Sequence, residues 1–319
     1  MRQYLVRRVL LYIPTLLLAS LAIFAIMRAL PGDVAVLILG SQESGAAGVE
    51  HLEALRRELG LTEPLPVQYG RWMWTMVNGE FGGRSIMDKE PLSEIIARRL
   101  PVTLQIAVYT VIISWFLAIP MGVLAAVYQN KWPDYAIRVI SLAGHALPNF
   151  WIALVLLLIM LVVFRWTPPL FYANLWENPS AHLEKAIWPA LVLAWGFSSY
   201  LVRVTRSNLL EVLRQDYVRT AWAKGLREQV VIVRHALRNA LIPVITLGGL
   251  QLGALLGGTV ILEAIFSLPG IGQGIILSAA TRDYPVIQSL TMLLVFVQVT
   301  LNLVVDVSYA FVDPRISYR

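Results

Sequence analysis

Cysteine is absent from the 319 residues, and charged side chains are scarce at 14% of the chain. The first absence excludes a disulfide framework, thiolate metal ligands and a cysteine nucleophile. The second excludes the composition of an ordinary soluble domain, in which about a quarter of the residues are charged. Hydrophobic residues instead make up 57% of the sequence. The formal net charge of +6 is too small, and too scattered among apolar runs, to indicate a nucleic-acid partner.

The common motifs of catalysis are missing as well. The chain contains no G-x-x-x-x-G-K-[ST] phosphate loop, no H-E-x-x-H zinc pair and no G-x-S-x-G nucleophile elbow. Its 4 histidines lie far apart in the sequence, which argues against a membrane-embedded metalloenzyme. These absences favour transport over catalysis, and they predict that the chain itself binds no cofactor and no metal.

Six apolar stretches are long enough to cross a bilayer, for which a helix needs about 20 residues. They comprise residues 9–27, 100–127, 139–164, 187–202, 241–265 and 286–312. The first is too long for the apolar core of a secretory signal, and no small-residue cleavage site follows it, so we expect it to be retained. The sequence therefore predicts an all-α membrane protein built as a bundle of six transmembrane helices.

The distribution of basic residues predicts the orientation, because Lys and Arg are held on the cytoplasmic side of a membrane. Basic residues gather in the N-terminal tail, in the link around Lys131 and Arg138, in residues 203–238 and in the C-terminal tail. The opposite connections hold slightly more acidic than basic residues. We therefore expect both termini to be cytoplasmic.

Two connections are too long to be simple turns. The outer one, residues 31–99, is an extracytoplasmic insertion with an amphipathic pattern at 49–59 and a later aromatic run at Tyr69, Trp72 and Trp74. It can be a solvated cap or a docking surface for an external partner, and the sequence leaves both open. The inner one, residues 203–240, is basic and has a helical composition.

The last apolar stretch carries a polar stripe. Gln298, Asn302 and Asp306 recur at intervals of four residues, so they share one helix face. Polar side chains at membrane depth are costly and usually face a bundle interior or a water-filled path. Interhelical hydrogen bonding explains the stripe as well as a pore lining does. On either interpretation we expect the stripe to face inward.

The fifth stretch combines glycines with polar side chains. Gly249, Gly253 and Gly257 lie at four-residue spacing, which predicts a face where another backbone packs closely. Across from them lies Gln251, followed by Glu263 near the outer boundary, where a carboxylate can still reach water. We expect Glu263 to interact with another side chain of the fold in a structural role.

The third stretch places His145 and Asn149 on one side of a helix, with Pro148 between them. Proline kinks a helix and frees a carbonyl, so this combination marks a bend next to polar groups. The candidates for a translocation path are therefore His145, Asn149, Gln251, Gln298, Asn302 and Asp306.

Within the inner connection, residues 217–227 form the most informative segment. Ala221 and Gly225 stand one helical turn apart and are flanked by Arg219, Lys224 and Arg227. A short helix here could lie along the cytoplasmic surface and seat closely in a groove of another protein. Attraction of a basic loop to anionic lipid headgroups is the alternative, and this segment alone does not decide between them.

Short motifs occur in order along nearly the whole chain. They are L-P-G-D at 30–33, L-G-L-T-E-P at 59–64, G-E-F-G at 79–82, D-Y-V-R-T-A-W-A-K-G-L at 216–226, H-A-L-R-N-A-L-I-P at 235–243, E-A-I-F-S-L-P-G at 263–270, R-D-Y-P at 282–285 and D-P-R at 313–315. Together they resemble the permease subunits of ATP-binding-cassette importers, within the dipeptide and oligopeptide branch. In the inner-loop pattern of that family, Ala221, Gly225 and Leu237 match, whereas the opening acid and the closing proline do not.

The resemblance implies a heteromeric machine in the cytoplasmic membrane of a bacterium or archaeon. Residues 1–319 would form one permease domain with the six-helix bundle of a type I importer, and residues 203–240 would be its cytoplasmic coupling loop. Its partners would be a second homologous permease, two ATPase subunits that bind ATP and Mg, and an extracytoplasmic solute-binding protein. The residues implied in ATPase coupling are Arg219, Thr220, Ala221, Lys224, Gly225, Leu226 and Arg227.

The implied function is peptide import by alternating access, without any substrate bond made or broken by this chain. Related permeases import nickel, glutathione or sugars, so these cargoes remain alternatives. A self-contained channel or ion-coupled carrier could instead use Asp306 and Glu263 as proton or cation sites. The segment from Ala221 to Gly225 favours the importer, because a solitary carrier does not need it. An intramembrane hydrolase would lack a convincing nucleophile and base.

Overall fold

The computed structural model describes residues 2–29, 53, 56, 61–169 and 171–312. Within these residues the regular secondary structure is helical, and extended backbone pairs only at an isolated bridge between Arg84 and Pro91. The described residues within 1–8, 104–268 and 300–319 form one compact unit, called unit 1. Those within 9–103 and 269–299 form the other, called unit 2.

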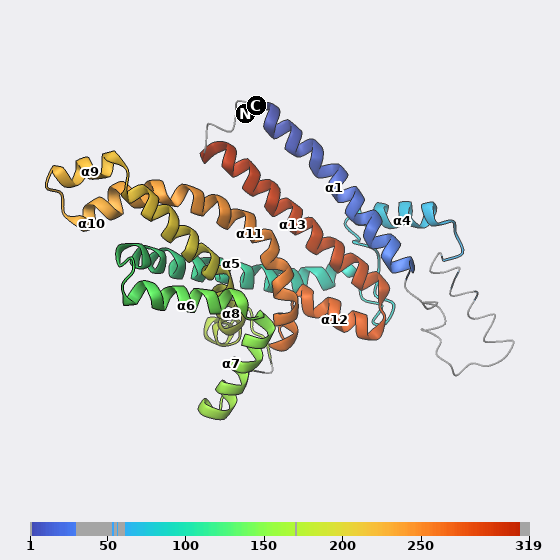
Figure 1. The fold of residues 1–319 in the computed structure, drawn as a ribbon. Helices are drawn as coiled ribbons and strands as arrows, with labels where there is room; N and C mark the ends of the chain where they lie inside the picture. Colours follow the sequence, from blue (N-terminus) through green and yellow to red (C-terminus); the bar gives the residue numbers. More distant parts are fainter. Residues whose placement is uncertain (1, 30–52, 54–55, 57–60, 170, 313–319) are drawn as a thin grey trace. The chain divides into compact units, whose positions relative to one another are not determined.

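Figure 1 shows the helices in chain order. They are α1 (Arg2–Ala29), α4 (Leu65–Val77), α5 (Leu92–Val127), α6 (Trp132–Ala146), α7 (Asn149–Phe164), α8 (Pro179–Leu213), α9 (Asp216–Ala223), α10 (Glu228–Val230), the π-helix η1 (Val231–Leu237), α11 (Arg238–Ile265), α12 (Ile271–Thr281) and α13 (Tyr284–Val312).

Five helical stretches of the described chain are long and apolar enough to cross a membrane. They are Arg8–Ala29, Leu92–Val127, Pro179–Leu213, Glu228–Gly253 and Tyr284–Val307. A sixth crossing is obtained if α6 and α7, which form a bent pair, count as one span. Each of the six predicted stretches falls on one of these elements, so the all-α membrane fold is confirmed.

The third predicted stretch is not one kinked helix. α6 ends at Ala146 and α7 begins at Asn149, and the two helices differ in direction by 107°. Between them Leu147 adopts an extended backbone with φ −85° and ψ 134°. Proline lacks an N–H and disfavours the helical conformation of the residue before it, so Pro148 ends α6 outright. His145 and Asn149 therefore lie on different helices, which corrects the prediction that they share one side.

Helices also extend into both predicted long connections. Residues 92–99 of the outer insertion belong to α5, and residues 203–213 of the inner loop belong to α8. The short helix α12 has no counterpart in the sequence analysis. Most of the predicted amphipathic helix at 49–59 lies outside the described residues, although Glu53 and Arg56 within it are helical.

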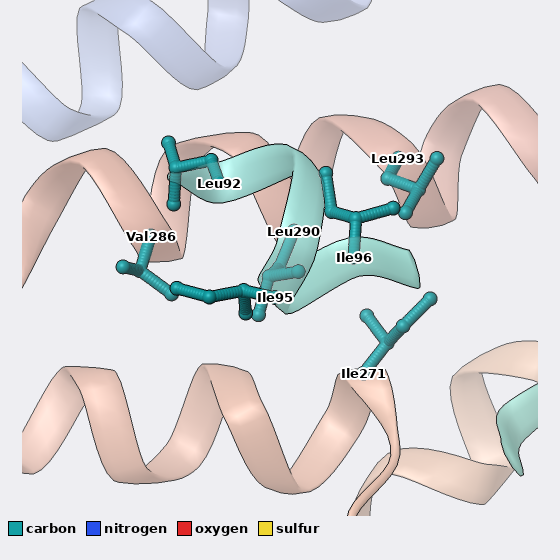
Figure 2. Packing of buried hydrophobic residues seen from close by; sticks show 7 residues of the cluster. All are labelled: Leu92, Ile95, Ile96, Ile271, Val286, Leu290 and Leu293. Atoms are coloured by element: carbon teal, nitrogen blue, oxygen red, sulfur yellow. The ribbon is translucent and has the colours of Figure 1, made fainter. Parts of the chain in front are cut away.

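Unit 2 is built around a cluster of aliphatic side chains that Figure 2 shows from close by. The cluster brings together the first turns of α5, the start of α12 and the first half of α13, through Leu92, Ile95, Ile96, Ile271, Val286, Leu290 and Leu293. The backbone N–H of Ile271 donates to Thr103 Oγ1 at 2.9 Å, and Arg99 Nη1 donates to the Gly270 carbonyl at 3.0 Å. These bonds secure the start of α12 against α5.

A carboxylate at the start of α13 holds the loop that precedes α5. Asp283 is 3% exposed and accepts a hydrogen bond from the Ser85 hydroxyl. The backbone N–H groups of Ile86 and Met87 also donate to it, at 3.3 and 3.4 Å. Two segments far apart in the sequence are therefore joined within unit 2 by one buried acid.

Unit 1 is organised around α8, which packs against α6, α7 and α11. Backbones approach closely where α6 carries a glycine, since a Cβ on Gly144 would lie 2.3 Å from Ser199 Oγ. The same two helices share a buried ion pair, in which Arg206 Nε and Nη2 lie 2.7 and 2.8 Å from the carboxylate oxygens of Asp134. These contacts make α6 and α8 a rigid pair.

Candidate functional site

The inner loop folds into a compact helical tip at the ends of α8 and α11 (Figure 1). α9 begins after Gln215 and ends at Ala223, and Lys224 caps it by donating its N–H to the carbonyl of Thr220 at 3.1 Å. The π-helix η1 then leads into α11. The predicted short helix in this segment is therefore present.

One side of α9 packs on the body of its own chain. Val218 is fully buried and Ala221 is 6% exposed, and both belong to an apolar cluster with Leu209, Val231 and Ala236. Their spacing of three residues places them on the same helix face. Ala221 therefore cannot insert into a groove of another protein, contrary to the prediction from the sequence, because its side chain is already buried against α8 and η1.

Gly225 has a different role from the one that its spacing suggests. It lies beyond the end of α9 with φ at +76°, a conformation that glycine adopts without strain. Its N–H donates to the Trp222 carbonyl at 2.9 Å, and no atom of the described residues lies within 4 Å of the position a Cβ would take. Gly225 therefore reverses the chain and does not continue one helical face with Ala221.

The outward side of the tip carries aromatic and basic side chains. Every residue from 222 to 230 is exposed, and so are Arg219 and Thr220. Tyr217 and Trp222 are 43% and 41% exposed, and Tyr217 is held by a hydrogen bond from Asn239 Nδ2 to its hydroxyl at 2.8 Å. The predicted coupling residues are thus exposed, except Ala221, and the surface that they form includes two aromatic rings that the sequence analysis did not single out.

The polar stripe of α13 is divided between two environments. Gln298 and Asn302 are exposed. Asp306 Oδ2 instead lies 2.9 Å from Arg8 Nη1, and its side chain is 17% exposed. The expectation that the whole stripe faces inward is therefore not met within a single chain. Asp306 joins α13 to α1 as an ion pair, which favours the interhelical interpretation for this residue.

The glycines of α11 are only partly packed. Gly253 is buried and Gly249 half-buried, but Gly257 is exposed, and a Cβ added to it would meet no atom of the described chain within 4 Å. Gly248 makes a close contact instead, since a Cβ on it would lie 2.7 Å from the ring of Trp115. The small residue at Gly248 therefore makes room for a side chain of α5. At Gly257 no second backbone of the described chain packs against the helix.

Two polar residues of α11 also occupy different environments. Gln251 is half-buried, whereas Glu263 is completely buried. The expectation that the Glu263 carboxylate reaches water is therefore wrong, because its side chain has no exposed surface within the chain. Its interior position agrees with a structural role.

The two candidates at the break between α6 and α7 are separated. His145 is exposed in the last turn of α6. Asn149 begins α7 and lies against α8, where a Cβ on Gly196 would come within 2.8 Å of Asn149 Oδ1. The structure therefore places Asn149 at a helix contact and leaves His145 at the surface of the chain.

A hydrogen-bonded cluster around His182 was missed by the sequence analysis. His182 is completely buried, and its Nδ1 lies 3.1 Å from the carbonyl of Ala173, which can only accept. Nδ1 therefore donates to this carbonyl, and Nε2 lies 2.9 Å from the Tyr109 hydroxyl. Burial raises the pKa of Tyr172 to about 12, and its hydroxyl donates to Gln105 Oε1 at 2.9 Å. No spacing in the sequence signals this cluster, since its members come from three separate segments.

The described residues contain no group of three or more His, Cys, Asp or Glu side chains that could hold a metal ion.

Comparison with known families accounts for nearly all of the sequence. Residues 118–318 match the family described as the inner membrane component of binding-protein-dependent transport systems, and residues 1–107 match the N-terminal membrane component of such systems. The chain belongs to this permease family. The permease is accordingly a multi-pass inner membrane component with the membrane fold of a type I ATP-binding-cassette importer.

Full-length relatives agree with this assignment. The permease is 42% identical over 320 residues to the oligopeptide transport system permease protein AppB of Bacillus subtilis, and the alignment covers 100% of both chains. It is 38% identical over 319 residues to the glutathione transport system permease protein GsiC of Salmonella paratyphi A, again with 100% of both chains covered. Membership of a binding-protein-dependent family argues against the self-contained carrier considered above.

Proposed function

We propose that this permease is one half of the membrane unit of an ATP-driven peptide importer. It pairs with a second homologous permease, and two ATPase subunits bind ATP and Mg on the cytoplasmic side. An extracytoplasmic solute-binding protein delivers the substrate, and the chain itself performs no chemistry on it. Support for a peptide cargo is the higher identity to the oligopeptide permease, 42%, than to the glutathione permease, 38%, each over the full length.

The geometry of α9 is the observation that carries the coupling part of this proposal. Its buried face is fixed to α8 and η1 by the cluster around Val218 and Ala221, whereas its outward face is exposed. A close-packed interior transmits displacement because it has little free volume to absorb it. A force that an ATPase applies to Trp222 and its neighbours would therefore move α8 and α11 and shift the bundle between its inward-facing and outward-facing states.

The exposed polar residues of α13 support a translocation path between the two permeases. Gln298 and Asn302 lie on a membrane-spanning helix and are exposed in a single chain. Amide side chains exposed to lipid would be costly. A lining position beside the second permease would let them face water and substrate instead.

An added side chain on α9 tests the coupling. Ala223 is the last residue of α9 and is exposed, so Ala223→Trp adds bulk to the outward face without disturbing the buried cluster. We expect ATP-driven uptake into liposomes to fall about tenfold or more, with loss of ATPase subunits that co-purify with the permease. Gly225→Leu is a less suitable test, because the positive φ of Gly225 would add backbone strain.

Ala280→Trp is the matched control, since Ala280 is an exposed alanine in another short helix, α12. It should retain the ATPase subunits at the level of the unmodified permease. If Ala223→Trp behaves like this control, α9 is not the coupling element. If Arg219→Ala is more harmful than Ala223→Trp, attraction to lipid headgroups explains the basic tip better.

Uptake with defined cargoes tests the substrate class. The purified complex in liposomes should take up a labelled tetrapeptide when ATP is enclosed with the ATPase subunits, and it should not accumulate glutathione, nickel or a disaccharide. Accumulation of glutathione without the tetrapeptide would replace the peptide proposal by the glutathione alternative. A complex with an inactivated ATPase is the control for passive leakage.

A further inference from the structure

The π-helix η1 connects the exposed tip to α11 and packs against α9. It comprises Val231–Leu237 and lies between α10 and α11. π-helices are rare and occur mostly as single turns within α-helices, frequently at functional sites. Each N–H of a π-helix bonds to the carbonyl five residues earlier, whereas the α-helix bonds to the carbonyl four residues earlier, so a π turn holds an extra residue. η1 therefore shifts the register between the residues before it and those after it.

This register decides which side chain packs beneath α9. Val231, Ala236 and Ala240 are completely buried and lie in one apolar cluster with side chains of α9. Ala236 and Ala240 are four residues apart, so they share a face of an α-helix. Val231 precedes Ala236 by five residues, which in an α-helix would place it about 140° around the axis. The extra residue of the π turn is therefore what brings Val231 onto this face.

The sequence also offers an apolar side chain for the α-helical register. Residues 230–233 read V-V-I-V, four consecutive apolar residues. Val233 precedes Ala236 by three residues, so the two would share a face if this segment were α-helical. In the present form Val233 is 62% exposed. The π register thus buries Val231 and exposes Val233, and the α register would exchange the two valines at the same site.

The helix is weakened on the other side of η1 as well. Pro243 lies within α11 and has no N–H, so the helical hydrogen bond to the carbonyl of Asn239 cannot form. Helices bend at prolines and at π turns. Residues 238–242 therefore form a short helical segment between two irregularities, where the chain can turn with little loss of hydrogen bonding.

We propose that η1 is a register switch between the coupling helix α9 and the membrane-spanning helix α11. In the π register Val231 packs beneath α9, and in the α register Val233 takes its place. The exchange turns residues 228–233 by about 100° relative to α11 and shifts them by about 1.5 Å, the rotation and rise of one helical residue. Displacement of α9 drives the exchange, because α9 packs on η1. This step rests on the proposed function, in which an ATPase moves α9.

Cysteine labelling tests the exchange directly, because the native chain has no cysteine. Val231→Cys and Val233→Cys are prepared singly in the complex in nanodiscs. A maleimide is added without nucleotide, or after the ATPases are trapped with ATP and vanadate. Between the two states, the labelling rates of the two cysteines should change about tenfold in opposite directions. Val230→Cys is the matched control, since Val230 is exposed now and would lie about 120° from Ala236 in the α register, so it should react in both states.

Two labelling outcomes overturn the proposal. The first is an unchanged rate at both positions 231 and 233. The second is protection of Val233→Cys in the trapped state while Val231→Cys stays protected in both states. A docked ATPase would then cover Val233 without any change of register.

A pair of asparagine substitutions gives a second readout. Asparagine and valine have similar helix propensities. Val233→Asn should leave the unfolding temperature and the co-purifying ATPase unchanged, because Val233 is exposed in the π register. It should lower ATP-driven uptake about tenfold, because its amide would be buried without a partner in the α register alone. Val230→Asn makes the same change at a position exposed in both registers, and it should retain uptake. Equal uptake by the two variants, or a loss of stability in Val233→Asn, overturns the switch.

The switch and the proposed function can fail separately. If the complex takes up the tetrapeptide but the labelling rates at 231 and 233 do not change, the switch is wrong and the proposed function stands. If the rates exchange but glutathione is accumulated without the tetrapeptide, the switch stands and the peptide proposal fails.

Discussion

Asp134 shows how one buried side chain can hold two membrane helices together. It lies in the first turn of α6 and is completely buried, with both oxygens bound by Arg206 of α8. The N–H of Asn130 also donates to it at 2.9 Å. Removing one member of a buried ion pair leaves the other charge without compensation, which costs more than the pair contributes.

We therefore expect Asp134→Ala to lower the free energy of unfolding by about 3–5 kcal/mol. Asp216→Ala is the matched control, because Asp216 is 98% exposed and lies 3.6 Å from Arg219. Such an exposed pair contributes at most about 1 kcal/mol. Thermal unfolding of the purified permease in one detergent measures both. Equal effects would mean that the Asp134–Arg206 pair makes no special contribution.

At the scale of helices, close contacts depend on small residues. Lipid tails are as apolar as leucine, so packing and hydrogen bonds, and not the hydrophobic effect, hold membrane helices together. α6 meets α8 at Gly144, where a Cβ would also lie 2.7 Å from Trp195 Nε1. Gly257 of α11 meets no atom within 4 Å in the described part of the chain. Of these two glycines, the first is required by the packing of this chain and the second is not.

Gly144→Ala should accordingly lower the unfolding temperature by several degrees, because its new methyl group would overlap Ser199 and Trp195. Gly257→Ala should leave the unfolding temperature of the separated chain unchanged or slightly higher, since alanine is the better helix former. Thermal unfolding of both variants under identical conditions makes the comparison. A larger loss at Gly257 than at Gly144 would contradict this description of the α6–α8 contact.

The exposed stripe of α13 leads to a prediction about transport. Asn302 and Val304 are both exposed on this helix, but only Asn302 can hydrogen-bond to water or substrate. Asn302→Leu should therefore reduce ATP-driven uptake more than Val304→Leu at equal expression. Val304→Leu controls for side-chain size on the same helix. Equal uptake by both variants would mean that Asn302 does not line the translocation path and only contributes to packing.

At the scale of the whole molecule, the orientation in the membrane follows from charge. The helical tip of α9 and α10 lies in the basic inner loop, and the loop held by Asp283 lies in the outer insertion. The family assignment places the chain in the inner membrane. We therefore expect Lys224 on the cytoplasmic side and Lys89 on the outer side.

Single cysteines test this orientation, because the native chain has none. Lys89→Cys and Lys224→Cys replace exposed residues, so both should be accessible to a maleimide. An impermeant maleimide added to intact cells should label only Lys89→Cys, and Lys224→Cys should react after the inner membrane is opened. Labelling of both positions from the same side would contradict the proposed topology.

The sequence alone determined the class of this protein. Long apolar runs need helical backbone in a membrane, so the all-α membrane fold was predictable from length and composition. The ordered motifs indicated the family that comparison then confirmed. The short helix α9 was also predictable, because its residues belong to one local segment.

Tertiary structure decided which of the polar and small residues are available for function. Periodicity places Asp306 on a face with Asn302, but it cannot show that Arg8, almost the whole chain away, neutralises Asp306. Spacing likewise joins Ala221 to Gly225, although burial against α8 and η1 separates their roles. Asp283 likewise holds Ser85 and Ile86, which lie almost 200 residues earlier and meet it only in the folded chain. Local patterns specify helices and their faces, whereas the partner of each face is set by long-range packing, which no single segment encodes.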